Sequence, residues 1–424
     1  MEWCLCMSKT IAVVGVGYVG INLASAFSSK FNVIGYDVDK EKIEKLSQGI
    51  DVTGEIKCDL KSCNISFTYD ATILKSADVI IVTVPTPTDK YNKPDLFCII
   101  EATKTIAKNM KKGVLVIYES TVVPGTTSRL CRELLEMYSD LKCEDDFMLG
   151  YSPERINPGD DVHTIYNSTK IISGTNAETT NMMKEIYSMI INDVYVVDSI
   201  EIAEAAKLIE NTQRDINIAF MNQMVQYLTK KDIPRKDVFD AMKTKWNSVG
   251  FTPGLVGGHC IGIDPYYLIN DACENQLSLS LVEEARNINE NVSHFIVDKI
   301  MTMIGDNVRV GILGFSYKKD SNDIRNTKVY DIYSKLVDKG ISVCVSDYNL
   351  RGIDVMKQYN VNFVDKLSDV NLVILAVPHS EYVMYDVLEY KNMFKNDANM
   401  MIYDIYNVLD VDKFKKNNII VEGM

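Results

Sequence analysis

The sequence lacks the long apolar segments and the excess of positive charge that would direct it to a membrane or to nucleic acid. No run of 18 apolar residues occurs in the chain, so we expect no segment that inserts into a bilayer. The net charge of −13 argues against general binding to nucleic acid or anionic lipid. An anionic substrate would therefore have to be bound by local Lys and Arg residues. With 424 residues, the chain is long enough for two or three domains.

Signals for metal binding and for export are also missing. The ten cysteines include no CxxC pair, and the four histidines have no recognisable partners, so we expect no metal site. Residues 1–9 lack a basic region followed by an apolar stretch, and so they predict no secretory signal. We therefore expect a cytoplasmic protein whose thiols stay reduced.

The first positive signal is a glycine-rich turn between a predicted strand and a predicted helix. The apolar run 11–14 predicts a buried strand, Gly15-Val16-Gly17-Tyr18-Val19-Gly20 follows it, and residues 21–27 predict a helix. A second strand over 33–36 ends at Asp37, seventeen residues after Gly20. This order predicts a dinucleotide site, in which Asp37 accepts the ribose hydroxyls and favours NAD over NADP. A glycine turn without a ligand is the alternative.

Two further apolar runs, 79–84 and 114–118, predict parallel strands. They lead into the loops 85–89 and 119–125, and residues 151–155 place a carboxylate at a similar edge. Because ligands lie beyond the carboxyl ends of parallel strands, we expect both loops to contact the cofactor. Taken alone, each loop is also compatible with a plain turn.

Residues 199–231 contain neither proline nor glycine and have helical spacing throughout, so they predict one long helix. Lys207 and Asn211 are four residues apart and share a face of it. From the residues alone, a solvated pair is the plainer interpretation. A helix of this length is also a common dimer interface.

The last part of the chain partly repeats the first. Strands are predicted over 308–314, ending in glycine, over 343–347, ending in an acid, and over 372–378. The turn at 314–319 lacks the full glycine pattern, so we expect it to bind something other than a second dinucleotide. Lys318, Lys319 and Arg325 suggest phosphates.

These segments together predict an α/β protein. It has two Rossmann-like, doubly wound parallel-sheet domains joined by a central all-α domain that contains the long helix. The expected boundaries are 1–198 for the NAD-binding domain, 199–300 for the helical domain and 301–424 for the second Rossmann-like domain.

One cysteine has neighbours typical of covalent catalysis. Cys260 follows Gly257, Gly258 and His259 and precedes Asp264 by four residues. A thiolate attacks an aldehyde, and the thiohemiacetal can lose a hydride to leave a thioester that water hydrolyses. Asp264 is a candidate to position or deprotonate that water. His259 is a structural residue, a substrate contact or a base. A lone cysteine is more often an inert thiol, but these neighbours favour a nucleophile.

In this order, the motifs resemble those of the nucleotide-sugar 6-dehydrogenases, the superfamily of UDP-glucose, UDP-N-acetylmannosamine and GDP-mannose dehydrogenases. The resemblance extends from Gly15 to about residue 410 and implies NAD-dependent, four-electron oxidation of C6 of a nucleotide hexose. It rests on Gly15–Gly20, 84–87, 120–122, 152–154, Lys207 with Asn211, 257–260 with Asp264, and Lys318 with Arg325.

The resemblance also implies roles for individual residues. Cys260 is the nucleophile, Lys207 holds the developing oxyanion and Asn211 orients an oxygen or a water. Asp264 and Glu154 handle protons and the hydrolytic water, with Thr121 helping. The implied cofactor contacts are Gly15, Gly17, Tyr18, Val19, Gly20, Asp37, Thr83, Pro85, Thr86, Thr121 and Arg325. The implied substrate contacts are Glu154, Arg155, Lys207, Asn211, Lys245, Trp246, Asn247, Gly257, His259 and Lys318. The third domain would bind UDP, and the long helix would form a homodimer.

Departures from the UDP-glucose branch narrow the substrate. That branch usually has Ser, Ala or Tyr before the cysteine and a second glutamate four residues after the one matching Glu154. Here His259 and Pro158 take these positions. This pattern resembles the branch for 2-acetamido sugars. Residues 244–247 and 253–256 look most like those of enzymes for UDP-N-acetylglucosamine or UDP-N-acetylgalactosamine in the synthesis of surface polysaccharide such as capsule or O-antigen.

Several alternatives stay open. The same chemistry on UDP-glucose or UDP-N-acetylmannosamine is the nearest one. A two-electron hydroxyacid dehydrogenase and a non-catalytic NAD-binding protein are the others, although the second leaves Cys260, Lys207 and Asp264 unexplained. The epimer at C2 or C4 and the base for hydrolysis are also open.

Overall fold

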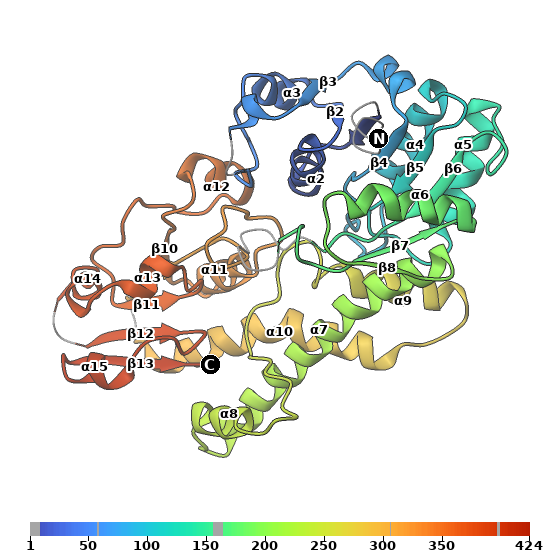
Figure 1. The fold of residues 1–424 in the computed structure, drawn as a ribbon. Coiled ribbons are helices and arrows are strands. Elements are labelled where there is room, and N and C mark those ends of the chain that lie inside the picture. Colours follow the sequence, from blue (N-terminus) through green and yellow to red (C-terminus); the bar gives the residue numbers. More distant parts are fainter. Residues whose placement is uncertain (1–8, 57–58, 156–163, 306, 397–398) are drawn as a thin grey trace. The chain divides into compact units, whose positions relative to one another are not determined.

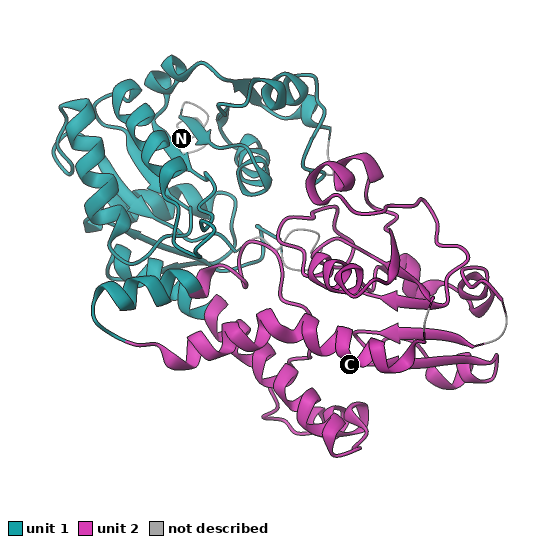
Figure 2. Cartoon of the chain, turned by 180° about the vertical axis from the view of Figure 1, so that it is seen from behind, with its two compact units in different colours: residues 1–210, 266–277 teal, residues 211–265, 278–424 magenta. Residues whose placement is uncertain are grey.

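The computed structural model describes residues 9–56, 59–155, 164–305, 307–396 and 399–424. The chain forms two compact units, coloured separately in Figure 2. Unit 1 comprises residues 1–210 with 266–277, and unit 2 comprises residues 211–265 with 278–424. The division at 198 and 300 stays a prediction. The expectations for the start of the chain and for Pro158 lie outside the described residues.

Unit 1 is built on an eight-stranded sheet of order β3-β2-β1-β4-β5-β6-β7-β8 (Figure 1). Each neighbouring pair is parallel except β6 with β7. The reversed β7 departs from the predicted parallel sheet, and it brings its first residue, Lys170, to the edge where β5 and β6 end. The strands are β1 (Thr10–Val14), β2 (Asn32–Tyr36), β3 (Ile65–Thr68), β4 (Val79–Val82), β5 (Leu115–Tyr118), β6 (Met148–Tyr151), β7 (Lys170–Gly174) and β8 (Val194–Val196).

Helices cover both faces of this sheet, as in a doubly wound fold. On β1, Ala12 and Val14 pack into one core, whereas Ile11 and Val13 pack into the other, because successive side chains on a strand point to opposite faces. The first core includes α4 (Phe97–Asn109) and α5 (Arg132–Ser139), and the second includes α2 (Tyr18–Ser28), α3 (Lys40–Ser47) and α6 (Ala177–Ser188). The short helices are η1 (Leu60–Ser62), η2 (Ala71–Ser76) and η3 (Thr126–Cys131).

Two helices cross the division between the units. The long helix α7 (Ile200–Lys230) matches the helix expected over 199–231, and α9 (Asp264–Glu274) follows the Cys260 loop. Within the described ranges, no helix combines the length and the apolar character needed to cross a bilayer.

Unit 2 contains a five-stranded, all-parallel sheet of order β10-β9-β11-β12-β13 (Figure 1). Its strands are β9 (Arg309–Leu313), β10 (Ser342–Ser346), β11 (Leu372–Leu375), β12 (Met400–Asp404) and β13 (Ile419–Gly423). One core includes α10 (Ser280–Met303), α11 (Val329–Asp338) and α12 (Gly352–Tyr359), and the other includes α13 (Ser380–Met384), α14 (Val387–Lys391) and α15 (Val411–Lys415). A further helix, α8 (Arg235–Lys243), follows α7. The predicted fold class, two doubly wound sheets with a long-helix segment between them, is confirmed.

Candidate active site

The predicted glycine turn ends at the start of α2. Gly17 is the N-cap of this helix, no side chain caps it, and its first turn has no acidic residue. The N–H groups and the positive end of the helix dipole are therefore available to an anion. A Cβ atom on Gly20 would collide with the carbonyl oxygen of Gly15, so the close approach of helix to turn requires glycine. With Tyr18 and Val19 in the first turn of α2, this cradle fits a dinucleotide diphosphate.

Asp37 directly follows β2, beside the same turn. One carboxylate oxygen, Oδ2, accepts from the Val16 N–H at 3.1 Å and from Lys42 Nζ at 2.8 Å, and Oδ1 accepts from the Asp39 N–H at 3.0 Å. These bonds fix the carboxylate and give it a cationic neighbour. We did not predict Lys42 from the sequence, although a lysine in the first turn of the helix after the acid was a usable signal.

Hydroxyl groups join the loops after β4 and β5 to the glycine turn. Thr83 Oγ1 donates to the Gly15 carbonyl oxygen at 2.7 Å, and Thr86 Oγ1 donates to that of Thr121 at 2.8 Å. Ser120 Oγ donates to the Val84 carbonyl oxygen at 2.7 Å. The structure therefore gathers the expected cofactor contacts Thr83, Pro85, Thr86 and Thr121 at one edge of the sheet.

A buried carboxylate on α7 holds the loop that follows Thr121. Glu204 accepts from the N–H groups of Gly125 at 2.5 Å and Thr127 at 2.9 Å. It is 0% exposed, and this burial raises its pKa to about 7. Glu204 lies three residues before Lys207 and was not predicted, because nothing in the local sequence indicates the distant loop that it contacts.

Lys207 and Glu154 meet through the backbone. Lys207 Nζ donates to the carbonyl oxygen of Glu154 at 2.7 Å, and the side chain of Lys207 is buried. Next to them, Arg155 pairs with Glu210 at 2.9 Å. Unit 1 therefore brings together three residues that the sequence predicted for substrate, namely Lys207, Glu154 and Arg155.

In unit 2, the turn at Cys260 leads directly into α9. The Cys260 carbonyl oxygen accepts from the N–H groups of Ile263 at 3.0 Å and Asp264 at 2.8 Å, and the Cys260 residue is exposed. Asp264 is buried, and its Oδ2 accepts from Asn211 Nδ2 at 2.6 Å. The predicted residues Asn211 and Asp264 thus form a pair four residues after the thiol.

The glycines before Cys260 are held by the segment after β9. Asn326 Nδ2 donates to the Gly258 carbonyl oxygen at 2.9 Å. Gly258 has φ of +76°, and a Cβ atom there would lie 2.7 Å from the ring of Tyr317. A side chain at Gly258 would therefore strain the backbone and displace Tyr317. At Gly257, a Cβ atom would lie 2.7 Å from the Asn326 carbonyl oxygen.

His259 is part of a chain of polar contacts from the same segment. Arg325 Nη2 donates to His259 Nε2 at 2.8 Å, and the Arg325 guanidinium also binds both oxygens of Asp323 at 2.7 to 3.1 Å. Burial and the Arg325 charge lower the pKa of His259 to about 4, although Asp323 opposes them. At neutral pH His259 is uncharged and its Nε2 is occupied, which supports the structural interpretation over the base. Asp323 was not predicted.

The remaining expected substrate contacts have a different setting. Lys245, Trp246 and Asn247 lie in an exposed turn after α8, and Trp246 is 97% exposed. Lys318 lies in the segment between β9 and α11 that also carries Asp323, Arg325 and Asn326. Within the described part of the chain, no three His, Cys, Asp or Glu side chains are grouped to hold a metal ion.

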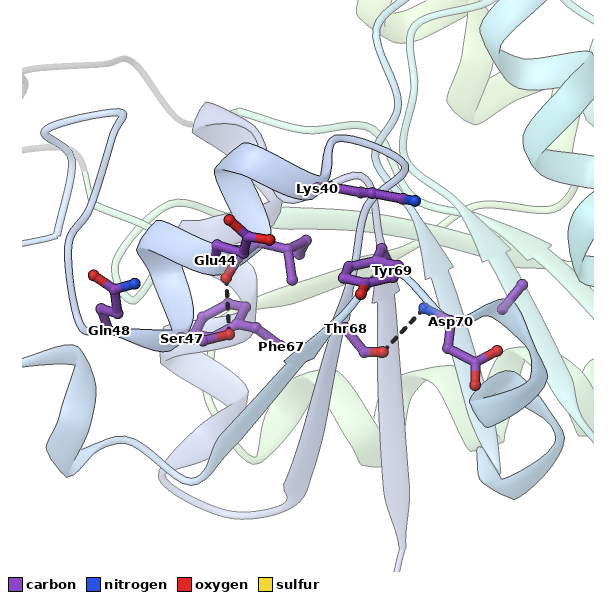
Figure 3. A pocket seen from close by; sticks show the side chains of 10 residues that line it. Lys40, Glu44, Ser47, Gln48, Phe67, Thr68, Tyr69 and Asp70 are labelled. Atoms are coloured by element: carbon purple, nitrogen blue, oxygen red, sulfur yellow. Dashed lines mark hydrogen bonds between the residues drawn. The ribbon is translucent and has the colours of Figure 1, made fainter.

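An open depression of about 920 Å³ lies beside α3 and β3 (Figure 3). Lys40 Nζ lies over the ring of Tyr69, 5.2 Å from its centroid. The lining includes Glu44, Phe67 and Asp70 but none of the residues that the sequence predicts for catalysis, substrate or NAD. We therefore assign the chemistry to the residues described above and not to this depression.

The chain matches three domain models of one family in the expected order. These are the NAD binding domain of the UDP-glucose/GDP-mannose dehydrogenase family over residues 9–191, its central domain over 201–291 and its UDP binding domain over 311–411.

Individual relatives agree with this match. Protein CapL of Staphylococcus aureus is 42% identical over 417 residues, which span 96% of this chain and 98% of CapL. A UDP-N-acetyl-D-glucosamine 6-dehydrogenase of Pseudomonas aeruginosa is 40% identical over 414 residues, spanning 95% of this chain and 98% of that enzyme. The structure of a UDP-D-ManNAc dehydrogenase from Pyrococcus horikoshii superposes with a TM-score of 0.86 at 28% identity, covering 98% of this chain and 99% of that one. The predicted family, enzyme class and NAD cofactor are confirmed. The chain belongs to the UDP-glucose/GDP-mannose dehydrogenase family and is an NAD-dependent oxidoreductase with a UDP-binding domain.

Proposed function

We propose that this chain oxidises C6 of UDP-N-acetylglucosamine or UDP-N-acetylgalactosamine to the carboxylate, for the synthesis of surface polysaccharide. The observation that carries the proposal is the exposed Cys260 in a glycine loop, followed by the paired Asp264 and Asn211. The acetamido sugar is supported by His259 before the cysteine and by the identity of 40% with the Pseudomonas aeruginosa enzyme.

The residues for NAD are those of the glycine turn and its neighbours. The N-terminus of α2 binds the diphosphate, and Asp37, with Lys42 beside it, binds the adenosine ribose. When bound, NAD accepts a hydride from C6 in each of the two oxidation steps. The loops containing Thr83, Pro85, Thr86 and Thr121 line the same edge, and we include Arg325 as a further contact.

The first oxidation turns the C6 alcohol into an aldehyde. C6 loses a hydride and its hydroxyl loses a proton, so negative charge develops on the oxygen. Lys207 stabilises this charge, and Asn211 orients the oxygen. Because Lys207 Nζ is held by the Glu154 carbonyl oxygen, its charge is positioned before the substrate arrives.

The second oxidation proceeds on sulfur. The Cys260 thiolate adds to the aldehyde carbon, and loss of the second hydride from the thiohemiacetal leaves a thioester. Water then attacks the thioester carbon, the thiolate leaves, and the carboxylate is released. Asp264 and Glu154 take up the protons of this water, and the bond from Asn211 fixes one oxygen of Asp264. Lys318 and residues 245–247 contribute to binding the UDP-sugar.

The test is the number of NADH molecules formed per UDP-sugar consumed. UDP-GlcNAc, UDP-GalNAc, UDP-ManNAc and UDP-glucose are each supplied with excess NAD. We expect two NADH per sugar with UDP-GlcNAc or UDP-GalNAc. Turnover confined to UDP-ManNAc or UDP-glucose would change the substrate. One NADH per sugar would overturn the covalent scheme in favour of a two-electron dehydrogenase, and NAD binding without turnover would indicate a non-catalytic protein.

We also propose that the chain is a homodimer formed along α7. Ile202, Ile209, Phe220 and Tyr227 are 47% to 58% exposed and are spaced by seven, eleven and seven residues. At 3.6 residues per turn these spacings place all four on one face of the helix, so they form an apolar stripe. We expect Phe220→Glu to yield monomers in sedimentation velocity, whereas Met137→Glu, at an exposed position of α5, leaves the dimer intact. A monomeric wild-type protein would contradict this proposal.

A further inference from the structure

A buried charged group in unit 1, which we call the Lys170 cluster, consists of Glu119, Glu154, Lys170 and Tyr187. Glu119 and Glu154 follow β5 and β6, Lys170 begins the reversed strand β7, and Tyr187 lies near the end of α6. Lys170 Nζ lies 2.6 Å from Glu119 Oε2 and 3.5 Å from Glu154 Oε2. The Tyr187 hydroxyl donates to Glu119 Oε1, and Lys170 Nζ lies 5.4 Å from the centroid of the Tyr187 ring.

The Lys170 cluster is costly to bury and is therefore a weak source of stability. The Lys170 side chain is 4% exposed, and one cation faces two carboxylates. Removing such groups from water costs several kcal/mol per ion, which the attraction between them repays only in part. Burial raises the pKa of Glu119 to about 7, with Glu154 adding to it and Lys170 opposing it. Burial lowers the pKa of Lys170, but the two carboxylates outweigh it and the net shift is upward.

Both oxygens of Glu154 have a positively polarised neighbour. Oε1 accepts from the Arg155 N–H at 2.5 Å, and Oε2 faces Lys170 Nζ. The other charged groups nearby are Lys207, whose Nζ binds the Glu154 carbonyl oxygen, and Arg155, whose guanidinium pairs with Glu210. In these contacts Lys170 is therefore the side-chain cation that faces the Glu154 carboxylate, and Glu119 competes for it at the shorter distance.

We propose that Lys170 is a positioning residue for the Glu154 carboxylate, and that Glu119 and Tyr187 determine how much of the Lys170 charge reaches Glu154. The inference rests on the proposed function, in which Glu154 handles a proton or the hydrolytic water. Lys170 keeps Glu154 ionised and fixes its orientation. Glu119 draws the ammonium away, and the Tyr187 hydroxyl, by donating to Glu119, offsets part of that pull.

This arrangement predicts shifts of opposite sign for two substitutions within the cluster. Without the Lys170 charge, Glu154 takes up a proton more readily, so the acidic limb of the pH profile of kcat moves to higher pH. Without the Glu119 charge, Lys170 is available to Glu154 alone, so the acidic limb moves to lower pH. A cluster with a merely structural role would lower activity in both variants without such opposite shifts.

The experiment measures NADH formation from UDP-GlcNAc and NAD between pH 5 and 9. The proteins are the wild type, Lys170→Met, Glu119→Gln and Tyr187→Phe. We expect the acidic limb to rise by about one pH unit in Lys170→Met and to fall by about one unit in Glu119→Gln, because a charge at this distance shifts a pKa by about one to three units. In Lys170→Met, kcat falls about tenfold or more while KM for the sugar changes less than twofold. Lys112→Met is the matched control, since Lys112 pairs with Asp146 at an exposed position. We expect it to keep the wild-type profile.

If Lys170→Met does not fold, as judged by circular dichroism, the other two variants decide. Tyr187→Phe removes the donor to Glu119 and should move the acidic limb slightly upward, opposite to Glu119→Gln. Shifts in the same direction, or no shifts, in proteins that turn over would overturn the inference alone. A wild type that forms no NADH from any of the four UDP-sugars would overturn the proposed function and this inference with it.

Discussion

The two Rossmann-like sheets of this chain carry an acid at the same place and use it differently. In unit 1, Gly15 N donates to the Tyr36 carbonyl oxygen at 2.8 Å, and Asp37 comes next. In unit 2, Gly314 N donates to the Ser346 carbonyl oxygen, also at 2.8 Å, and Asp347 comes next. Asp37 accepts one N–H from its turn and one Lys42 contact, whereas Asp347 Oδ2 accepts the N–H groups of Phe315 and Ser316 at 2.7 and 3.1 Å and lies 3.1 Å from His379 Nε2.

The segments after the two glycines differ as well. In unit 1, α2 begins at Tyr18, three residues after Gly15, and presents its N-terminus. In unit 2, α11 begins only at Val329, and the intervening segment instead holds the Cys260 loop through Asn326 and Arg325. The His379 ring completes the second turn, because its Nδ1 accepts from the Asp320 N–H at 2.8 Å and its Nε2 therefore carries the proton.

One fold thus serves two purposes in one chain. Where the acid keeps capacity beside an uncapped helix, the turn fits a dinucleotide. Where backbone N–H groups and a histidine occupy the acid, the turn becomes a rigid support for catalysis. The ligand is decided by these side chains and not by the sheet.

The largest effect should come from the thiol that the second segment supports. We expect Cys260→Ser to lower the rate of acid formation by at least about a thousandfold, since removal of a covalent nucleophile commonly costs that much. NADH release and product are measured together. Cys273→Ser, at an exposed cysteine of α9, is the control and should keep full activity. Acid formation at near the wild-type rate in Cys260→Ser would refute the covalent scheme.

The next effect should distinguish the two acids by stability. We expect Asp347→Asn to lower the free energy of unfolding by about 2 kcal/mol, because an amide cannot accept from all the buried donors around both oxygens. Urea unfolding measures it, and the KM for NAD should stay unchanged. An unaltered unfolding midpoint would show that the second turn is not held in the way described.

The same substitution at Asp37 should act on the cofactor. We expect Asp37→Asn to raise KM for NAD about tenfold, with little change in stability, because a charged acceptor for the ribose is lost. The wild type should prefer NAD over NADP by on the order of a hundredfold, since like charges in contact cost several kcal/mol. In Asp37→Asn this preference should narrow, because Lys42 is no longer paired with a carboxylate. Equal use of the two cofactors by the wild type would contradict the role of Asp37.

The smallest effect should come from His259. Its pKa of about 4 keeps it neutral above pH 5, so it does not titrate where the enzyme works. We expect His259→Gln, which can still accept from Arg325, to lower kcat by less than about tenfold and to leave the pH profile between 5 and 9 unchanged. Loss of a limb of that profile would restore His259 as the base.

Local pattern was enough for much of the fold and part of the candidate site. Strand, glycine turn, helix, strand and acid follow one another within residues 10–37, so their order along the chain reveals the dinucleotide turn. The absence of proline and glycine over 199–231 predicted α7 for the same local reason. The residues around Cys260 were equally visible, because the glycines, the thiol and Asp264 lie within eight positions.

The sequence by itself therefore determined the type and order of the elements, the family and the cofactor, since each depends on short-range spacing. Only the tertiary structure showed that β7 is reversed, that Glu204 holds the Gly125 loop and that Lys170 joins Glu119 and Glu154. These contacts join residues 79, 51 and 16 positions apart. Charged residues are ordinarily exposed, so composition gives no sign that these are buried. Their burial follows from which strand ends meet at the sheet edge, and only the assembled fold determines that.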